Sequence, residues 1–342
     1  MAYIVSSTEK VRGKGADYET KAMLYLMGGR EDSFEIYSFA IDFYNDVTGL
    51  NVHAEKAWDL QSKGNVAKGP MEIGRELVTL FKNYLSDLTF NYLILFMAGV
   101  PDTFRIDSSI NTFGIENITE KALKSVRNGL VKEATDKIYI DNDKITDENV
   151  DAFLKKVTFV IDDKTKAEYI KHILSLNPKF IPKDAVLEGI FNTIRDAQAA
   201  KKNNSSVEGE MVTHLRDVYA YDRTIKAREI RLMVINTLVN RDIVGGGVPR
   251  YFFPLIQNYD GIKQGEVIED CQLQISVALF DKANSEAFWD LLDAIIDAVI
   301  DNRKLSTAET YDMISQNDAV RKTLLDVLSI QYLISVMKEA LE

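Results

Sequence analysis

The sequence has little cysteine, histidine and proline, and no long apolar run. Its 342 residues include one cysteine, Cys271, with three histidines and six prolines. A single cysteine excludes an internal disulfide and is typical of a reducing compartment. No apolar run approaches the roughly 20 residues that span a bilayer. The segment MAYIVSSTEK lacks the basic flank and apolar core of an export signal. We therefore expect a cytoplasmic protein without a membrane segment.

Positive charge is also in short supply. The chain carries 41 basic and 52 acidic side chains, for a formal net charge of −11. This balance argues against general adhesion to nucleic acid or to anionic membranes. The acidity is uneven, since residues 281–342 hold twelve acidic and six basic side chains. Net charge therefore leaves room for a local contact with phosphates.

The first half mixes helix and strand patterns. Apolar spacing predicts helices over 16–27 and 119–135, and another that begins near Pro70; β-branched and aromatic runs predict strands over 34–43, 56–62, 90–98 and 157–162. Between the first two strands, Gly49 indicates a turn. We expect an α/β fold with one mixed sheet flanked by helices.

The second half is predicted to be mainly helical. The polar stretch 199–209 indicates an exposed loop or linker, while 250–256 and 268–280 are each compatible with a strand. An apolar stripe over 285–302 predicts a core-facing helix, and Ser306 with Glu309 has capping-box spacing.

We expect two domains in this chain. The first spans residues 1–235, with a core of about 12–165 that carries the α/β pattern. The second spans residues 236–342 and is expected to serve oligomerisation or partner docking.

Three residues could form a catalytic site. Gln61 and Lys63 point to the same face of one predicted strand, because they are separated by a single residue. If the strands pair as a hairpin, Asp46 approaches that face. Carboxylate and carbonyl oxygens suit Mg²⁺, which activates water, and a lysine can orient that water or stabilise the transition state. The pattern by itself is common, so a solvated hairpin is the alternative.

Further motifs surround these three residues in a defined order. Residues 15–19 read Gly-Ala-Asp-Tyr-Glu, Asp42 precedes Asp46 by four, and Gln61-Ser62-Lys63 lies on a strand; a helix over 72–84 and strands over 90–96 and 157–162 follow. This layout resembles the PD-(D/E)XK nuclease domain of the CD-NTase-associated endonucleases of CBASS anti-phage defence. A related nuclease subunit occurs in Lamassu-type systems. The resemblance covers about the first 165 residues and implies a restriction-endonuclease-like mixed sheet flanked by helices.

The resemblance implies a role for each matching residue. Asp46 and Gln61 would be ligands of Mg²⁺ (or Mn²⁺), and Lys63 the catalytic lysine. Glu19 and Asp42 would complete the acidic metal-binding cluster. The chain departs from the usual pattern at Gln61, where many of these enzymes have Glu. The amide keeps an oxygen ligand but removes a negative charge, which weakens metal binding.

Three basic residues after this strand are candidates for DNA binding. Lys68, Arg75 and Lys82 follow Lys63, and Arg75 and Lys82 are seven residues apart, close to two helical turns. We expect these two to share one face along the DNA path. The alternative is an ordinary charged helix face.

The resemblance implies a metal-dependent double-stranded DNA endonuclease of bacterial anti-phage defence. In CBASS nucleases the C-terminal half is an α/β sensor of cyclic oligonucleotides, which the helical tail here fits poorly. A sensor or ATPase partner subunit, as in Lamassu-type systems, together with homo-oligomerisation, is therefore favoured. The alternatives are a catalytically inactive nuclease-fold scaffold and a restriction-type endonuclease.

Other candidate sites are better explained by structure. An acidic stripe on the 285–302 segment is typical of a solvated helix face. Residues 141–149 resemble the start of a calcium loop but lack its glycine and final acid, which favours a helix cap. His53 lies between Asp46 and Gln61 without a clear role, and Cys271 is expected in the core.

Overall fold

The chain forms two compact units. The computed structural model describes residues 3–5, 13–174, 183–203, 207–238, 247–280 and 285–340. The first unit comprises Met1–Tyr169 and Phe191–Ala227, and the second comprises Ile170–Ile190 and Arg228–Glu342. The chain thus passes between the units more than once, whereas a single boundary, between residues 235 and 236, was predicted.

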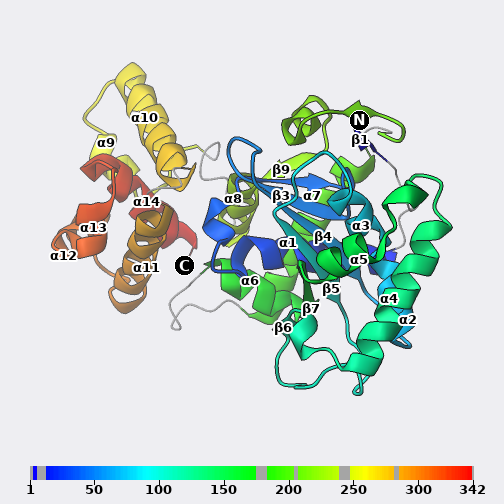
Figure 1. Ribbon diagram of the computed structural model, residues 1–342. Helices are drawn as coiled ribbons and strands as arrows, with labels where there is room; N and C mark the ends of the chain where they lie inside the picture. The colour runs from blue at the N-terminus through cyan, green and yellow to red at the C-terminus, as the bar shows by residue number, and fades with distance from the viewer. Residues whose placement is uncertain are drawn as a thin grey trace. The chain divides into compact units, whose positions relative to one another are not determined.

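The first unit is α/β, as predicted (Figure 1). Its strands are β1 (Tyr3–Ile4), β2 (Ser38–Ile41), β3 (Val47–Leu50), β4 (Ala57–Lys63), β5 (Tyr92–Met97), β6 (Thr112–Phe113), β7 (Val157–Ile161), β8 (Met211–Val212) and β9 (Thr224–Lys226). Its helices are α1 (Gly13–Gly28), α2 (Pro70–Glu76), α3 (Val78–Tyr84), α4 (Glu120–Thr135) and α5 (Asp147–Leu154). Helices α6 (Lys166–Leu174) and α7 (Asp184–Asn203) contribute residues to both units.

Seven of the described strands form a mixed sheet in the order β6-β7-β5-β4-β3-β2-β9. Strands β4, β5 and β7 are parallel, and β3, β2 and β9 extend the sheet beyond β4 with antiparallel pairing. The central strand β5 is almost entirely buried, which agrees with its continuous apolar run. The predicted mixed sheet is therefore confirmed.

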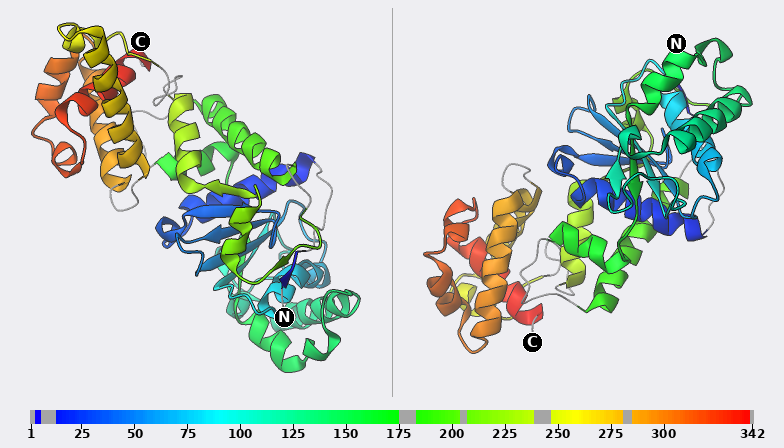
Figure 2. Two further views of the ribbon diagram at one scale, coloured as in Figure 1. Left: turned by 90° about the horizontal axis from the view of Figure 1, so that it is seen from above. Right: turned by 60° about the horizontal axis from the view of Figure 1, so that its bottom comes forward.

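Helices cover both faces of this sheet (Figures 1 and 2). Phe96 of β5 contacts the rings of Tyr25 in α1 and Tyr169 in α6 on one face. Leu93 and Leu95 point to the other face and share a core with residues of α3, α4 and α5. Because side chains alternate along each strand, the side chains of the neighbouring β4 are divided between the same two faces of the sheet.

The hairpin predicted between the first two strands contains an additional strand. Strand β3 pairs with β2 on one side and with β4 on the other. Gly49 therefore lies within a strand, and the turn after it is closed by Asn51, whose side chain accepts from the backbone of Glu55 and Lys56. A Cβ at Gly49 would lie 3.1 Å from the Ile36 side chain, so the glycine makes room for core packing.

Helices α2 and α4 cross at a pair of glycines. A Cβ on Gly74 would lie 2.0 Å from the carbonyl oxygen of Val126, and one on Gly129 would lie 2.1 Å from that of Met71. The two backbones are therefore in direct contact, which only glycine permits. Pro70 occupies the first turn of α2, as predicted.

The described part of the second unit is helical. Beyond the segments shared with the first unit, it contains α8 (Ala227–Leu238), α9 (Phe253–Ile256), α10 (Gly261–Phe280), α11 (Ser285–Asp301), α12 (Thr307–Ile314), α13 (Asp318–Lys322) and α14 (Val327–Ala340). The strands predicted over 250–256 and 268–280 were wrong. Cys271, Ile275 and Ala278 are buried at helical spacing, so this apolar run belongs to α10.

Two further predictions for the second unit are confirmed. The apolar stripe of 285–302 forms the buried side of α11, with Leu291 and Ile295 fully buried. Ser306 and Glu309 form a reciprocal capping box at the start of α12.

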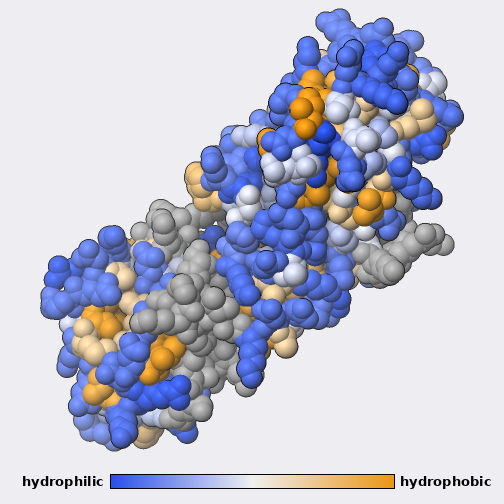
Figure 3. Space-filling view, turned by 90° about the horizontal axis from the view of Figure 1, so that it is seen from below, coloured by the Kyte–Doolittle hydropathy of each residue, from blue (hydrophilic) through white to orange (hydrophobic). Residues whose placement is uncertain are grey.

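No helix in the described part of the chain combines the length and apolarity needed to cross a membrane. On the face shown in Figure 3, hydrophilic side chains predominate and apolar ones form small separate groups.

Candidate active site

Asp46 lies where the turn between β2 and β3 meets the end of β4. Because β3 and β4 are antiparallel with Val47 opposite Leu60, the preceding Asp46 falls beside Gln61. The Gln61 Nε2 donates to Asp46 Oδ2 at 2.9 Å. The same oxygen accepts from the backbone nitrogen of Ser62 at 2.7 Å and from its hydroxyl at 2.8 Å. The predicted contact between Asp46 and Gln61 is therefore present, although an extra strand lies between the two predicted ones.

Lys63 ends β4 on the same face as Gln61. Its Nζ lies 2.9 Å from Glu76 Oε2 at the end of α2, and 28% of its side chain is exposed. Ion pairs with this exposure contribute only about 0–1 kcal/mol. The ion pair with Glu76 by itself therefore contributes little to stability. Nothing in the sequence marked Glu76 as the partner of Lys63.

Glu19 and Asp42 bring further negative charge to Asp46. Helix α1 passes close to the end of β4, because Gly64 has no Cβ to collide with the Tyr18 ring, which would lie 2.7 Å from it. Asp42 adopts a left-handed conformation with φ of 48°, and its backbone nitrogen donates to the Asp46 carbonyl at 3.1 Å. Aspartate tolerates this conformation better than most residues. The predicted acidic residues are thus gathered at one corner of the sheet.

The pKa of Glu19 reflects the proximity of these carboxylates. Burial, and then the negative charge of Asp46, raise the pKa of Glu19 to about 7, with a smaller contribution from Asp42; Lys202 acts in the opposite direction. The two aspartates therefore make ionisation of Glu19 more costly. A corner of this kind attracts a cation.

A cation supplied by the chain itself lies within this corner. The Lys202 Nζ is 3.1 Å from Glu19 Oε1 and 3.8 Å from Asp42 Oδ1. Arg223 Nη1 lies 3.8 Å from Asp42 Oδ2. Lys202 was not predicted at the site, because the polar stretch 199–209 was expected to be a loop, whereas α7 continues to Asn203. The helical spacing of Ile190, Ile194 and Gln198, all buried, is the signal that extends the helix.

The side-chain oxygens at this corner provide part of what a hard cation such as Mg²⁺ needs. Among the described residues, no group of three or more His, Cys, Asp or Glu side chains is placed to hold a metal ion. Mg²⁺ needs less, since it keeps several waters and commonly takes one or two protein carboxylates. Asp46 supplies one carboxylate, and Gln61 supplies an amide oxygen once its side chain turns over. The chemistry of these residues therefore fits Mg²⁺ or Mn²⁺ with a largely hydrated shell.

A fully buried aspartate, Asp59, helps to hold the turn that carries Asp46. Asp59 lies two residues before Gln61 on β4, is fully buried, and accepts hydrogen bonds from Thr48 at 2.8 Å, Asn83 at 2.7 Å and Asn45 at 3.3 Å. Asn45 Oδ1 in turn accepts from the backbone nitrogen of Asp46 at 3.1 Å. This network fixes the turn that carries Asp46. Burial raises the pKa of Asp59 to about 6, against the effect of these hydrogen bonds.

Asp59 is expected to make stability depend on pH. The carboxyl titrates near 4 when unfolded and near 6 when folded, so the folded chain binds the proton more tightly. Its contribution is full below pH 4 and is lost as pH rises past 6, by on the order of 3 kcal/mol. Denaturant unfolding in EDTA at pH 4.5 and 7.5 measures the effect. An Asp59→Asn variant should lose this part of the pH dependence; an unchanged dependence would rule out the assignment.

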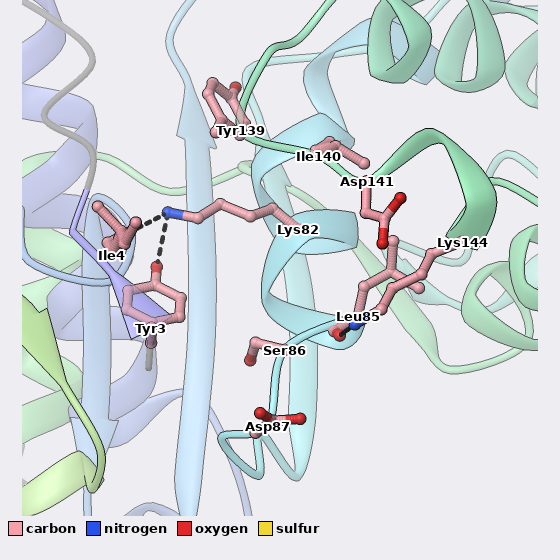
Figure 4. Close-up of a pocket in the computed structure, with 10 residues that line it drawn as sticks. All are labelled: Tyr3, Ile4, Lys82, Leu85, Ser86, Asp87, Tyr139, Ile140, Asp141 and Lys144. Carbon is pink, nitrogen blue, oxygen red and sulfur yellow. Dashed lines mark hydrogen bonds between the residues drawn. The ribbon is translucent and has the colours of Figure 1, made fainter. Parts of the chain in front are cut away.

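The three predicted DNA-binding residues do not share one face. Lys68 and Arg75 are exposed, and Arg75 lies next to Glu76 at the end of α2. Lys82 belongs to the separate helix α3 and is buried, and its Nζ donates to Ile4 O at 2.9 Å and Tyr3 Oη at 3.2 Å. Figure 4 shows it directed from α3 towards these residues, at the wall of a cavity of about 260 Å³. The prediction that Arg75 and Lys82 share a face was wrong, because α2 and α3 meet at Leu77 instead of forming one helix.

The remaining candidates have other surroundings in the fold. His53 is in the turn between β3 and β4 and lines a different cavity, of about 360 Å³, with His214. Residues 141–149 provide caps, as predicted: Thr146 accepts from the Asn149 backbone nitrogen at the start of α5. Cys271 is buried in the core, also as predicted.

No protein-family model, curated protein or solved structure matches the chain.

Proposed function

We propose that the first unit is a metal-dependent endonuclease that hydrolyses phosphodiester bonds in double-stranded DNA. The observation that carries this proposal is the contact between Asp46 and Gln61, with Lys63 on the same strand face. An acidic ligand, an amide oxygen and a lysine at one sheet edge are the groups such hydrolysis needs.

Each residue has a distinct part in the proposed reaction. Asp46 and Gln61 would hold Mg²⁺ or Mn²⁺, which would supply Lewis-acid activation of water and charge compensation on the phosphate. Ser62 keeps the Asp46 carboxylate oriented through two hydrogen bonds to Oδ2. Lys63 leaves Glu76 to orient the attacking water or to contact the phosphate. Glu19 and Asp42 raise the local negative potential that attracts the ion.

The proposed DNA path uses the exposed basic residues next to the site. Lys68 precedes α2, Arg75 lies in the last turn of this helix, and both side chains are exposed. Lys82 is omitted because its ammonium is buried against Tyr3 and Ile4. Contacts of this kind position the backbone without reading sequence.

We further propose a cytoplasmic role in anti-phage defence, in which a sensor or ATPase subunit or homo-oligomerisation restrains the nuclease. Support comes from the resemblance of the motifs around Asp46 and Gln61. The second unit offers a docking element, since Leu273 and Val277 are exposed one turn apart on α10.

A catalytically inactive scaffold is the second candidate. Gln61 removes one acidic ligand, and the described residues contain no preformed group of three metal-binding acids or imidazoles. A restriction-type endonuclease would share the site and differ only in its DNA target.

Cleavage of supercoiled plasmid separates an enzyme from a scaffold. The full-length protein should nick or linearise plasmid in Mg²⁺ or Mn²⁺ and stop when EDTA is added. Lys63→Ala should lower the rate by roughly 10²–10³-fold, because the charge on the transition state loses its partner. Cleavage that persists in EDTA, or at full rate in Lys63→Ala, would contradict the proposal.

A further inference from the structure

The lysine at the acidic corner has the position of a counter-ion. Lys202 is the last lysine of α7, and only 9% of its side chain is exposed. Its Nζ contacts Glu19 at 3.1 Å and approaches Asp42 to 3.8 Å. Burial lowers the pKa of this ammonium, but the charges of Glu19, Asp42 and Asp46 outweigh burial and raise it. The lysine is therefore held in its charged form by the same carboxylates that would attract a metal.

A divalent ion and this ammonium need the same negative charge. Two cations within a few ångströms of each other repel strongly in a poorly hydrated corner. The flexible four-carbon stem of lysine allows the ammonium to withdraw when another cation enters. Occupation of the corner by metal therefore requires that Lys202 give up part of its contact with Glu19 and Asp42.

We propose that Lys202 is a resident counter-ion that competes with the divalent ion and so sets the metal affinity of the site. This inference rests on the proposed metal-dependent function. Without metal, the Lys202 ammonium compensates the negative charge of Glu19 and Asp42 and reduces the repulsion between their carboxylates. With metal, the ammonium is displaced. Lys202 is thus a positioning residue whose charge determines the metal concentration at which the site fills.

The adjacent lysine provides a matched control. Lys201 lies one residue earlier on α7, pairs with Asp222 and does not contact Glu19 or Asp42 in any described ion pair. Lys201→Met removes the same charge from the chain without touching the corner. Lys202→Arg keeps the positive charge at the corner and replaces the ammonium group by a guanidinium group. Comparison of these two with Lys202→Met separates local charge from net charge.

Isothermal titration of the full-length protein with Mn²⁺ tests the proposal. Lys202→Met should bind Mn²⁺ at least about tenfold more tightly than wild type, which equals about 1.4 kcal/mol. Lys202→Arg and Lys201→Met should bind like wild type. Saturating Mn²⁺ should also raise the melting temperature of Lys202→Met more than that of wild type, since tighter binding to the folded state stabilises it more.

The possible outcomes distinguish the proposed role of Lys202 from the proposed metal site. A folded Lys202→Met protein that binds Mn²⁺ no more tightly than wild type overturns the role of Lys202 and leaves the nuclease proposal standing. Absence of Mn²⁺ binding in wild type and in every variant removes the metal site, and both proposals with it. Circular dichroism verifies folding, and Lys202→Gln, which keeps a polar end, replaces Lys202→Met if the latter unfolds.

Discussion

Replacement of Asp46 by asparagine is expected to reduce plasmid cleavage by roughly 10³-fold. The substitution is nearly isosteric, and the oxygen of the new amide can still accept from Ser62, whose nitrogen and hydroxyl lie 2.7 and 2.8 Å from the present carboxylate. What is lost is the negative charge that holds the ion. Folding should therefore survive, while metal binding and turnover should not.

The melting temperature and a matched variant make this result interpretable. Asp312→Asn removes one negative charge from an exposed position on α12, in the second unit, and should cleave like wild type. Asp46→Asn should melt within a few degrees of wild type, because its hydrogen bonds are retained. Equal cleavage by wild type and Asp46→Asn would indicate that hydrolysis occurs at another site.

Substitution of Gly74 by alanine is expected to destabilise the first unit severely. The added Cβ would lie 2.0 Å from the Val126 carbonyl oxygen and 2.9 Å from the Leu130 backbone nitrogen. Both contacts are backbone atoms, so no side-chain rotation relieves them and the two helices must separate. Overpacking usually costs about 1–3 kcal/mol, and a backbone collision belongs at or above the top of that range. A loss of about 3 kcal/mol lowers the melting temperature of a unit of this size by roughly 6–12 °C.

The control for this prediction is another helical glycine. A Cβ on Gly189 of α7 would meet no atom within 4 Å. Gly189→Ala should leave the melting temperature unchanged or raise it slightly, because alanine favours helix. Differential scanning calorimetry of the two variants provides the comparison. A Gly74→Ala protein that melts with wild type would mean that α2 and α4 do not touch through their backbones.

This crossing also matters for the site. Helix α2 carries Glu76, the partner of Lys63, and the exposed Arg75. Displacement of α2 from α4 should therefore disturb Lys63, the proposed catalytic lysine, as well as stability. Loss of activity in Gly74→Ala is expected to accompany, and not to precede, loss of structure.

Local patterns in the sequence predict much of the first unit. The run 90–98 became the buried strand β5, and the pair Gln61 and Lys63 lies on one strand face because strands have a period of two. The proximity of Asp46 to Gln61 also followed, since chain segments close in sequence that pair in a sheet bring their ends together. These features depend on neighbours in the sequence.

Other features depend on contacts that a linear pattern does not contain. Strand β3 was missed because Gly49 is typical of a turn, whereas in the structure this residue pairs with both neighbouring strands and leaves room for the Ile36 side chain. Lys82 was expected on an exposed helix face, yet it is buried, and its ammonium donates to Tyr3 and Ile4. Lys202 reaches Glu19 from the opposite end of the first unit's sequence. Such long-range placement is set by the tertiary fold.

Cleavage of one supercoiled plasmid by wild type and Asp46→Asn, in Mg²⁺ and in EDTA, tests the central proposal most directly. The proposed site predicts nicked or linear product with wild type in Mg²⁺ and none with Asp46→Asn or in EDTA. Equal product from both proteins in Mg²⁺ would contradict the proposed role of Asp46 and its partners Gln61 and Lys63.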